Sequence, residues 1–482
     1  MRDAVFVVLF LSVIPAALLF LHSAVMLWIW TALAEPTFYL YGFAKQIPVN
    51  KLAVALTLMA VIVDRTRRRP LFDMHIWLLL LFTLHGAISY SFRLSDLPGS
   101  FLSLDKMIKI TALCIIMTMC AWDKIKVHAL VVVVGLAAGI HSALEGLKYI
   151  VSVGGHKVDV TAFGDNNYLA LAALMNVPIL LYAYRRSQSK VARTGFLGLL
   201  VASLIGVVAT ASRGGLIGLV FLGAFAFLQS RRKIFSLILI FIVSILLINF
   251  TPERWRDRMN TIGSADSDSS FMSRVSSWKL HTILAMDHPF TGGGFSALED
   301  SRVAVIYHAY FDRLSFIDSP RLEGPLAAHS IYFQVLGDLG FVGFFLFMAI
   351  ILTGLVHISV IRARTRSDES LAWCRDFAGL IRLSLILYLV VGAALSANYM
   401  EFLYILLTLI SILGRITREA KEHGAAQRHR MHGVRRPPAG EPLRSPAPID
   451  TVSPGRGTWR ARMQDRPEWR RRTPAPPPDG HA

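Results

Sequence analysis

Long apolar runs separated by short polar connections make up most of the chain. Many of the runs are close to twenty residues long, the length that an α-helix needs to cross the hydrocarbon layer of a membrane. They are continuously apolar rather than alternating, which favours helices over a transmembrane β-barrel. The runs cover residues 4–21, 24–35, 48–63, 75–92, 107–122, 127–150, 167–184, 194–211, 214–229, 234–249, 330–358, 379–396 and 400–414. The pattern predicts an all-α, polytopic transmembrane helical bundle of about 12–13 spans.

One long polar interruption, residues 250–329, breaks this pattern. It divides the chain into an expected N-terminal transmembrane bundle over 1–249 and C-terminal transmembrane helices over 330–414. A fourth part, 415–482, is rich in Arg and Pro and has few large apolar residues. Such a composition cannot bury a core, so we expect this tail to be disordered.

Within the long loop, Ser269-Ser270 precede apolar residues at roughly helical spacing. This spacing predicts an amphipathic helix that lies against the membrane surface. The three glycines of 291–295 lack the strand and helix of a dinucleotide-binding motif. We interpret them as a flexible corner that returns the chain to the membrane. Residues 298–326 carry no pattern that we can interpret.

Basic residues set the expected orientation. They gather in the connections that follow the third, fifth, seventh, ninth and eleventh runs. These connections are two spans apart, so they share one side, which the positive-inside rule makes cytoplasmic. The tail then lies inside as well. The other side receives four stretches: 154–167, 210–215, 250–329 and 396–401.

The composition agrees with a membrane protein, since 54% of the residues are hydrophobic and only 17% are charged. Soluble domains contain about a quarter charged residues. The net charge of +18 sits largely in short loops and in the tail. It therefore follows the positive-inside rule, and we expect no nucleic-acid partner. Cations of the tail suit contact with anionic membrane lipids.

Metal or cofactor binding is not expected. Cys114, Cys120 and Cys374 lack the spacing of metal ligands, and no disulfide framework is implied. Four histidines of the loop lack the spacing of ligands on one helix: His281, His288, His308 and His329. The N-terminal run lacks an obvious cleavage site, so we interpret it as a retained helix rather than a signal peptide.

Ser212-Arg213-Gly214 stands at the outer end of two closely spaced runs. An arginine there is unfavourable unless it is paired or reaches the interface. The glycine allows close approach of the backbone, and the free N–H groups of a helix start favour anions. Together these features suit a diphosphate. The structural alternative is an interfacial arginine that binds lipid headgroups beside a glycine used for helix packing.

Arg274 and Trp278 lie four residues apart and share a face of the predicted loop helix. Arginine can bind phosphate through two hydrogen bonds, and tryptophan suits the membrane interface or the face of a sugar ring. The alternative is an ordinary interfacial helix.

His329 opens the run that follows the loop, just before Ser330 and Tyr332. A neutral histidine at the mouth of a membrane cavity can accept a proton from a hydroxyl. A capping or interfacial role is the alternative. Asp165 and Asn166 begin another outer helix, where they can cap it or bind a sugar or an arginine.

These residues together resemble the O-antigen ligase family, and more narrowly the O-glycosylation ligases associated with exosortase systems. The resemblance extends over about residues 1–415. The stretches that carry it are 41–44, 165–167, 212–214, 258–262, Arg274 with Trp278, 289–295 and 327–343. The last of these is the most specific.

The resemblance implies a membrane glycosyltransferase of the C-type fold in the bacterial inner membrane, acting at its outer face without a metal. Arg213 and Arg274 would bind the diphosphate of a polyprenyl-diphosphate-linked glycan donor. His329 would orient or deprotonate the acceptor hydroxyl of lipid A-core, a protein or a polysaccharide. The expected substrate contacts are Ser212, Gly214, Trp278, Asp165, Asn166 and Tyr332. In-line attack would invert the anomeric carbon.

Two rival functions follow from the same pattern. A polysaccharide polymerase would share the fold and the arginines but use a second lipid-linked chain as acceptor. A transporter of lipid-linked sugar would carry ionisable residues near the middle of its spans, and the predicted spans are nearly free of them.

Overall fold

The computed structural model describes residues 2–433 except 157, 159–160, 162–163, 231, 235–236 and 239–268. Residues 1–425 form one compact unit, to which the description below is confined. The predicted span 234–249, the first part of the loop, the motif 258–262 and most of the tail lie outside the described residues.

The described chain is helical throughout, and no strand occurs in it. Its α-helices are α1 (Arg2–Leu19), α2 (Leu21–Ala34), α3 (Val49–Val63), α4 (Met74–Ser91), α5 (Pro98–Cys120), α6 (Lys124–Val151), α7 (Asn166–Arg186), α8 (Lys190–Ala209), α9 (Arg213–Gln229), α12 (Ser269–Asp287), α13 (Ser301–Ala309), α14 (Ile331–Arg364), α15 (Ala372–Val391) and α16 (Glu401–Gly433). The all-α prediction is confirmed.

Seven segments within the described residues are long and apolar enough to cross a membrane: 2–19, 74–91, 124–151, 166–186, 190–209, 331–364 and 369–394. Three shorter helices, α2, α3 and α9, are apolar as well. The protein is therefore a multi-pass membrane protein. Helix α5 begins at Pro98, earlier than the predicted run at 107. The prediction started late because Asp105 and Lys106 interrupt the apolar pattern just before that run.

Capping residues set several helix starts. The side chain of Asp165 accepts a hydrogen bond from the backbone N–H of Tyr168 at the start of α7. Ser212 does the same for Gly215 at the start of α9. Such caps satisfy backbone donors that lack a partner within the helix. They fix the helix starts that hold the candidate site.

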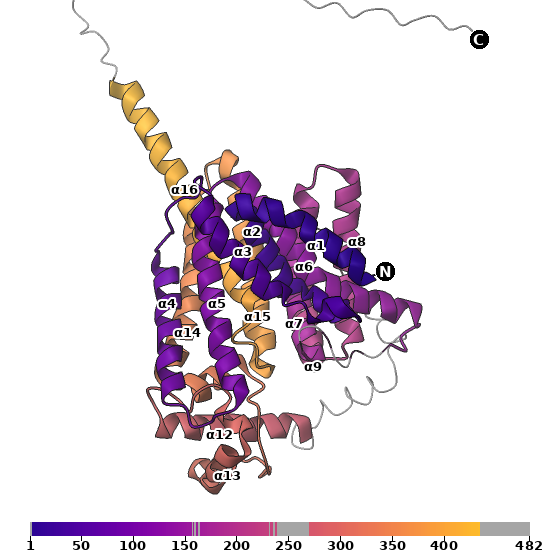
Figure 1. Ribbon diagram of the computed structural model, residues 1–482, viewed down its shortest axis with the longest axis vertical. Helices are drawn as coiled ribbons and strands as arrows, with labels where there is room; N and C mark the ends of the chain where they lie inside the picture. Colours follow the sequence, from indigo (N-terminus) through magenta and orange to yellow (C-terminus); the bar gives the residue numbers. More distant parts are fainter. Residues whose placement is uncertain are drawn as a thin grey trace, which may run out of the picture. The chain divides into compact units, whose positions relative to one another are not determined.

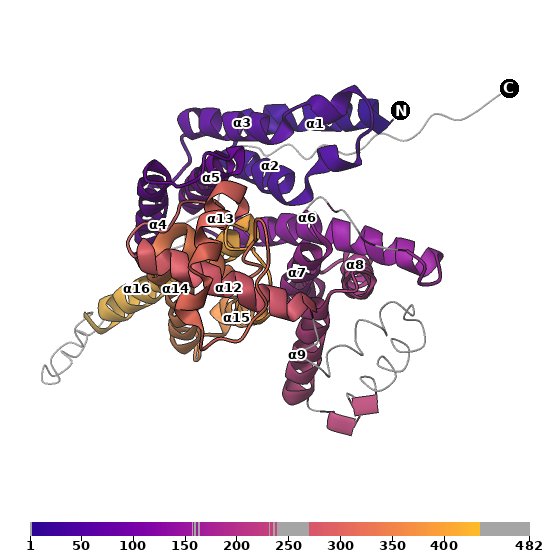
Figure 2. The same cartoon turned by 90° about the horizontal axis from the view of Figure 1, so that it is seen from below.

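Helix α7 lies at the centre of the packing, in contact with α6, α8, α9 and α15 (Figure 2). Helices α6 and α8 cross at two glycines, Gly146 and Gly206. A Cβ atom on Gly146 would lie 2.0 Å from the carbonyl oxygen of Ala202, so only glycine permits this crossing. Small residues at helix crossings are typical of membrane proteins, where close packing drives association.

The described part of the long loop forms a cap across one end of the bundle, which we name the loop end. Figure 1 shows α12 lying across the end where α4 finishes and α5 begins. Two hydrogen bonds join the loop to the bundle. Leu94 N–H donates to Gly293 O, and Ser100 Oγ donates to Phe295 O. The predicted loop helix is present as α12, and its contact with a membrane surface stays a prediction.

Residues 298–326, which the sequence left without an interpretation, complete this cap. They contain α13 and the 3₁₀ helices η5 (Ala297–Glu299) and η6 (Phe311–Leu314). Their apolar side chains pack with those of α12 in a small separate core: Leu280, Ile283, Leu284, Leu298, Val303, Tyr307, Phe311 and Leu314. Ser95 near α5 donates a hydrogen bond to the buried Asp300, which fastens the cap to the bundle.

The opposite end of the unit gathers basic residues, as the orientation count predicts. Arg415 donates hydrogen bonds to the carbonyl oxygens of Thr118 and Ala121 at the end of α5. Arg68 pairs with Glu419 there. The other end carries the starts of α7 and α9, and Asp165 there lies within electrostatic range of His329.

Candidate functional site

The starts of α7 and α9 lie side by side at the loop end. The Oγ atom of Ser212 donates a hydrogen bond to Asn167 Oδ1 at 2.7 Å. The Nδ2 atom of Asn166 donates to the carbonyl oxygen of Thr210 at 2.8 Å. Ala211 has a φ of 49°, a left-handed turn that directs the chain into α9. Arg213 is therefore presented by a rigid corner as the first residue of its helix.

Helix α12 and the chain entering α14 are held together by two side chains. Trp278 Nε1 donates a hydrogen bond to the carbonyl oxygen of Ala328 at 2.9 Å. Ser277 Oγ donates to the carbonyl oxygen of Ala327 at 2.7 Å. The Trp278 ring also stacks on Phe333, with centroids 5.1 Å apart. These contacts fix the backbone next to His329, whose φ of 46° lies in the left-handed region.

His329 brings three elements together. The imidazole lies within electrostatic range of Arg274 on α12 and of Asp165 at the start of α7. Desolvation is the main cause that lowers the pKa of His329; Arg274 lowers this pKa further, and Asp165 raises it. A neutral imidazole near pH 7 follows from the first two effects. We name Asp165, Arg274 and His329 the charged cluster.

The end of α15 joins the start of α9 to the start of α14. A Cβ atom on Gly214 would lie 3.6 Å from Val391 Cγ1. The hydroxyl of Tyr332 donates a hydrogen bond to the carbonyl oxygen of Leu389 at 2.9 Å. Both helix starts thus rest on the same turn of α15, so Arg213 belongs to the same end of the molecule as the charged cluster.

Several predicted substrate contacts have structural partners. Asp165 and Ser212 cap helices, Asn166 bridges α7 to the chain before α9, Trp278 clamps the loop, and Tyr332 binds α15. These bonds agree with the structural alternatives that the sequence left open. Their contact with a substrate stays a prediction, as does that of Gly214.

His281 lies beside the site, although no role was predicted for it. It is buried, and its Nδ1–H donates to the carbonyl oxygen of Ser277 at 2.8 Å. Burial is the main effect that lowers the pKa of His281 to about 4, and electrostatic interaction with His329 lowers this pKa as well. The spacing of three residues from Trp278 could have placed it on the same helix face. A neutral histidine therefore lies near His329.

The glycine stretch 289–295 is not the flexible corner that we expected but a turn bonded to α14. Gly293 N–H donates to Gly337 O, and Gly294 N–H donates to Asp338 O. Gly340 has a φ of 67° and breaks α14 at this point. Position 292 favours glycine for two reasons. Its φ of 63° lies in the left-handed region, and a Cβ atom there would lie 2.5 Å from Asp338 C.

Asp338 lies buried at this break. Gln334 Nε2 donates to both of its carboxylate oxygens, and the Tyr399 hydroxyl and the Ser296 N–H also donate to it. The expectation of spans nearly free of ionisable residues is therefore wrong. Other buried ionisable residues in spanning helices are His75, His141 and Glu145. The content of ionisable residues in the spans therefore does not argue against a transporter of lipid-linked sugar.

No group of three or more His, Cys, Asp or Glu residues could hold a metal ion in the part of the chain that the structure describes. The three cysteines are free and buried.

Two family models match separate parts of the chain. The O-Antigen ligase family model matches residues 198–348, which include Arg213, Arg274 and His329. Residues 198–348 therefore form an O-antigen ligase domain. A second model, of a family of unknown function, matches residues 1–188. No curated protein gives a significant match.

Proposed function

We propose that this protein transfers a glycan from a polyprenyl-diphosphate donor to an acceptor hydroxyl at the periplasmic face of the bacterial inner membrane. The observation that carries the proposal is the convergence of Arg274, His329 and Asp165 from three elements, within the loop end that also presents Arg213. The family match supports a glycan-transferring reaction. The tail is then cytoplasmic.

The proposed chemistry uses the cluster as follows. The acceptor oxygen attacks the anomeric carbon, and the bond from that carbon to the diphosphate oxygen breaks, leaving its electron pair on the diphosphate. Arg213 and Arg274 stabilise the negative charge of this leaving group. His329, neutral near pH 7, takes the proton of the acceptor hydroxyl. An in-line attack inverts the anomeric carbon, and the charge stabilisation comes from guanidinium groups rather than a metal.

The acceptor is a hydroxyl of lipid A-core, a protein or a polysaccharide. The resemblance to exosortase-associated O-glycosylation ligases makes a protein hydroxyl the first acceptor to test. Asp165 supports the site by opposing the electrostatic effect of Arg274 on His329. Trp278 holds the imidazole in place through the backbone of Ala328.

Reconstitution tests the proposal. The full-length protein in proteoliposomes would receive lipid-linked glycan extracted from a host that lacks the gene, together with an acceptor fraction from the same host. We expect glycan on the acceptor and free polyprenyl diphosphate. Elongation of glycan on the same lipid would instead indicate a polymerase. Movement of intact lipid-linked glycan across the bilayer without transfer would indicate a transporter.

A further inference from the structure

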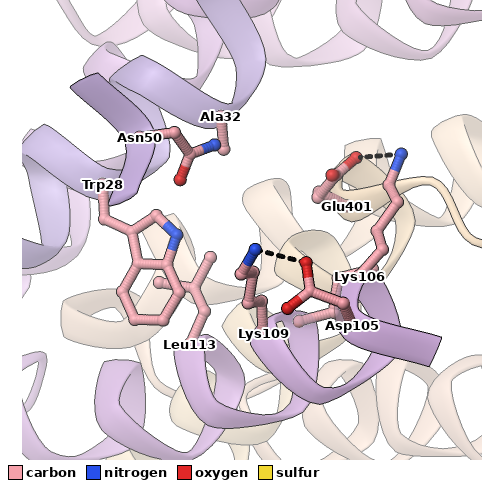
Figure 3. Close-up of a pocket in the computed structure, with 9 residues that line it drawn as sticks. Trp28, Ala32, Asn50, Asp105, Lys106, Lys109, Leu113 and Glu401 are labelled. Carbon is pink, nitrogen blue, oxygen red and sulfur yellow. Dashed lines mark hydrogen bonds and ion pairs between the residues drawn. The ribbon is translucent and has the colours of Figure 1, made fainter. Parts of the chain in front are cut away.

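A second polar site lies outside the O-antigen ligase match. Figure 3 shows a cavity between α2, α3, α5 and the start of α16. Its volume is about 170 Å³. The lining residues that matter here are Trp28, Asn50, Asp105, Lys106, Lys109 and Glu401. We name this space the N-terminal cavity, because α2, α3 and α5 all belong to the first part of the chain.

The charges of the N-terminal cavity are balanced. Lys106 Nζ pairs with Glu401 at 3.1 Å, and Lys109 pairs with Asp105 (Figure 3). Each ammonium group already faces a carboxylate, so the cavity offers no excess positive charge. Glu35, at the end of α2, lies within electrostatic range of Lys106 and Glu401; burial raises its pKa to about 7, so it adds only part of a negative charge near neutral pH. A diphosphate would meet repulsion here, whereas a neutral ligand would not.

The lining combines an apolar side with groups that both donate and accept hydrogen bonds. Trp28, Ile110 and Leu113 supply the apolar part, and Asn50 supplies an amide. The two ion pairs add further donors and acceptors. Sugar hydroxyls donate and accept, and the C–H face of a sugar ring packs on an aromatic side chain. Small-molecule sites typically combine an apolar surface with converging polar groups, and this lining has both.

Electrostatic interactions extend from the N-terminal cavity toward the charged cluster. Tyr168, in the first turn of α7, is within electrostatic range of Lys106 and Glu401 on one side and of Asp165 on the other. Asp165 is itself within range of His329. Pairwise electrostatic interactions therefore link the cavity, through Tyr168 and Asp165, to the place where the transfer is proposed.

We propose that the N-terminal cavity is a sugar-binding subsite, which holds one sugar unit of the donor glycan or of a glycan-bearing acceptor. The subsite rests on the proposed function for its role, though not for its chemistry. It assigns a task to the part of the chain whose family has no known function: residues 1–188 recognise the glycan, and residues 198–348 bind the diphosphate.

Direct binding tests the subsite. Saturation-transfer NMR on the full-length protein in nanodiscs would use free glucose, galactose, mannose, N-acetylglucosamine and glucuronic acid as probes. We expect at least one sugar to bind wild-type protein, and Asn50→Ala with Asp105→Asn to weaken this binding about fivefold or more, the effect of one or two lost hydrogen bonds. Lys51→Ala is the matched control, because Lys51 adjoins Asn50 but is exposed.

Binding of none of the sugars, or equal binding by the double variant, would overturn the subsite. Asn50→Ala alone leaves both ion pairs intact, so it serves if the double variant fails to fold. Transfer kinetics then identify the source of the sugar unit. A raised KM for the lipid-linked donor indicates the donor glycan, and a raised KM for the acceptor indicates the acceptor. An unchanged KM for both contradicts the subsite.

The two proposals can fail separately. Sugar binding without any transfer by wild-type protein would refute the proposed function and leave the subsite in place. Transfer by wild-type protein without sugar binding would refute the subsite alone.

Discussion

The charged cluster and the N-terminal cavity differ in how their charged side chains are arranged. In the cavity, Lys106 and Lys109 each face a carboxylate. In the charged cluster, Arg274 lowers the pKa of His329 and Asp165 raises it. The first arrangement suits a neutral polar ligand, and the second suits an anion. In the two proposals, the cavity binds a sugar unit and the charged cluster binds the diphosphate.

Removing the arginines gives the largest expected effect. Arg274→Ala and Arg213→Ala should each lower glycan transfer by about 100-fold or more, because charge on the departing diphosphate is left without its partner. Binding of monosaccharide probes should stay unchanged. Arg321→Ala is the control, since Arg321 is an exposed loop arginine in a surface ion pair with Asp312. Full activity of either variant would remove that arginine from the proposed site.

A substitution in the turn 289–295, which is bonded to α14, should also affect the charged cluster without affecting the N-terminal cavity. Gly292→Ala should destabilise the protein by about 1–3 kcal/mol, because the residue has a φ of 63° and its Cβ atom would meet Asp338. Thermal unfolding measures this loss. Transfer should fall because α12 carries Arg274, while sugar binding should persist. Gly99→Ala is the control, since a Cβ atom there meets nothing within 4 Å.

A smaller effect is expected on the pH dependence of transfer. Asp165 raises the pKa of His329 and Arg274 lowers it. Asp165→Asn should therefore move the acid limb of the rate profile to lower pH, because the neutral imidazole then survives further into acid. Arg274→Gln should move the limb of its residual activity to higher pH. Profiles of kcat/KM against pH measure both shifts. Identical acid limbs in all three proteins would argue against His329 as the base.

Much of the fold could be predicted from the sequence, because continuous apolar runs leave few choices other than membrane helices. The predicted start of α5 was too late, because Asp105 and Lys106 make the preceding part of the helix polar. The break in α14 could not be predicted either. It depends on a turn at 289–295 that is distant in sequence and bonds to Gly337 and Asp338.

The candidate site was predictable in its residue types but not in its arrangement. An arginine beside glycine and a histidine opening a helix are visible in the sequence, and the basic loops place both on one side. The proximity of Arg274 and Asp165 to His329 depends on helix packing, which spacing cannot reveal. The N-terminal cavity needs four helices from both ends of the chain, so no local pattern indicates it.

The most direct test of the central claim is complementation of a host that lacks the gene, with lipid-linked glycan and glycosylated acceptor measured together. Wild-type protein should restore the glycosylated acceptor and remove accumulated lipid-linked glycan. His329→Ala, inserted in the membrane at the same level, should restore neither. Full restoration by His329→Ala, or no accumulation of lipid-linked glycan in the deletion host, would contradict glycan transfer at the charged cluster.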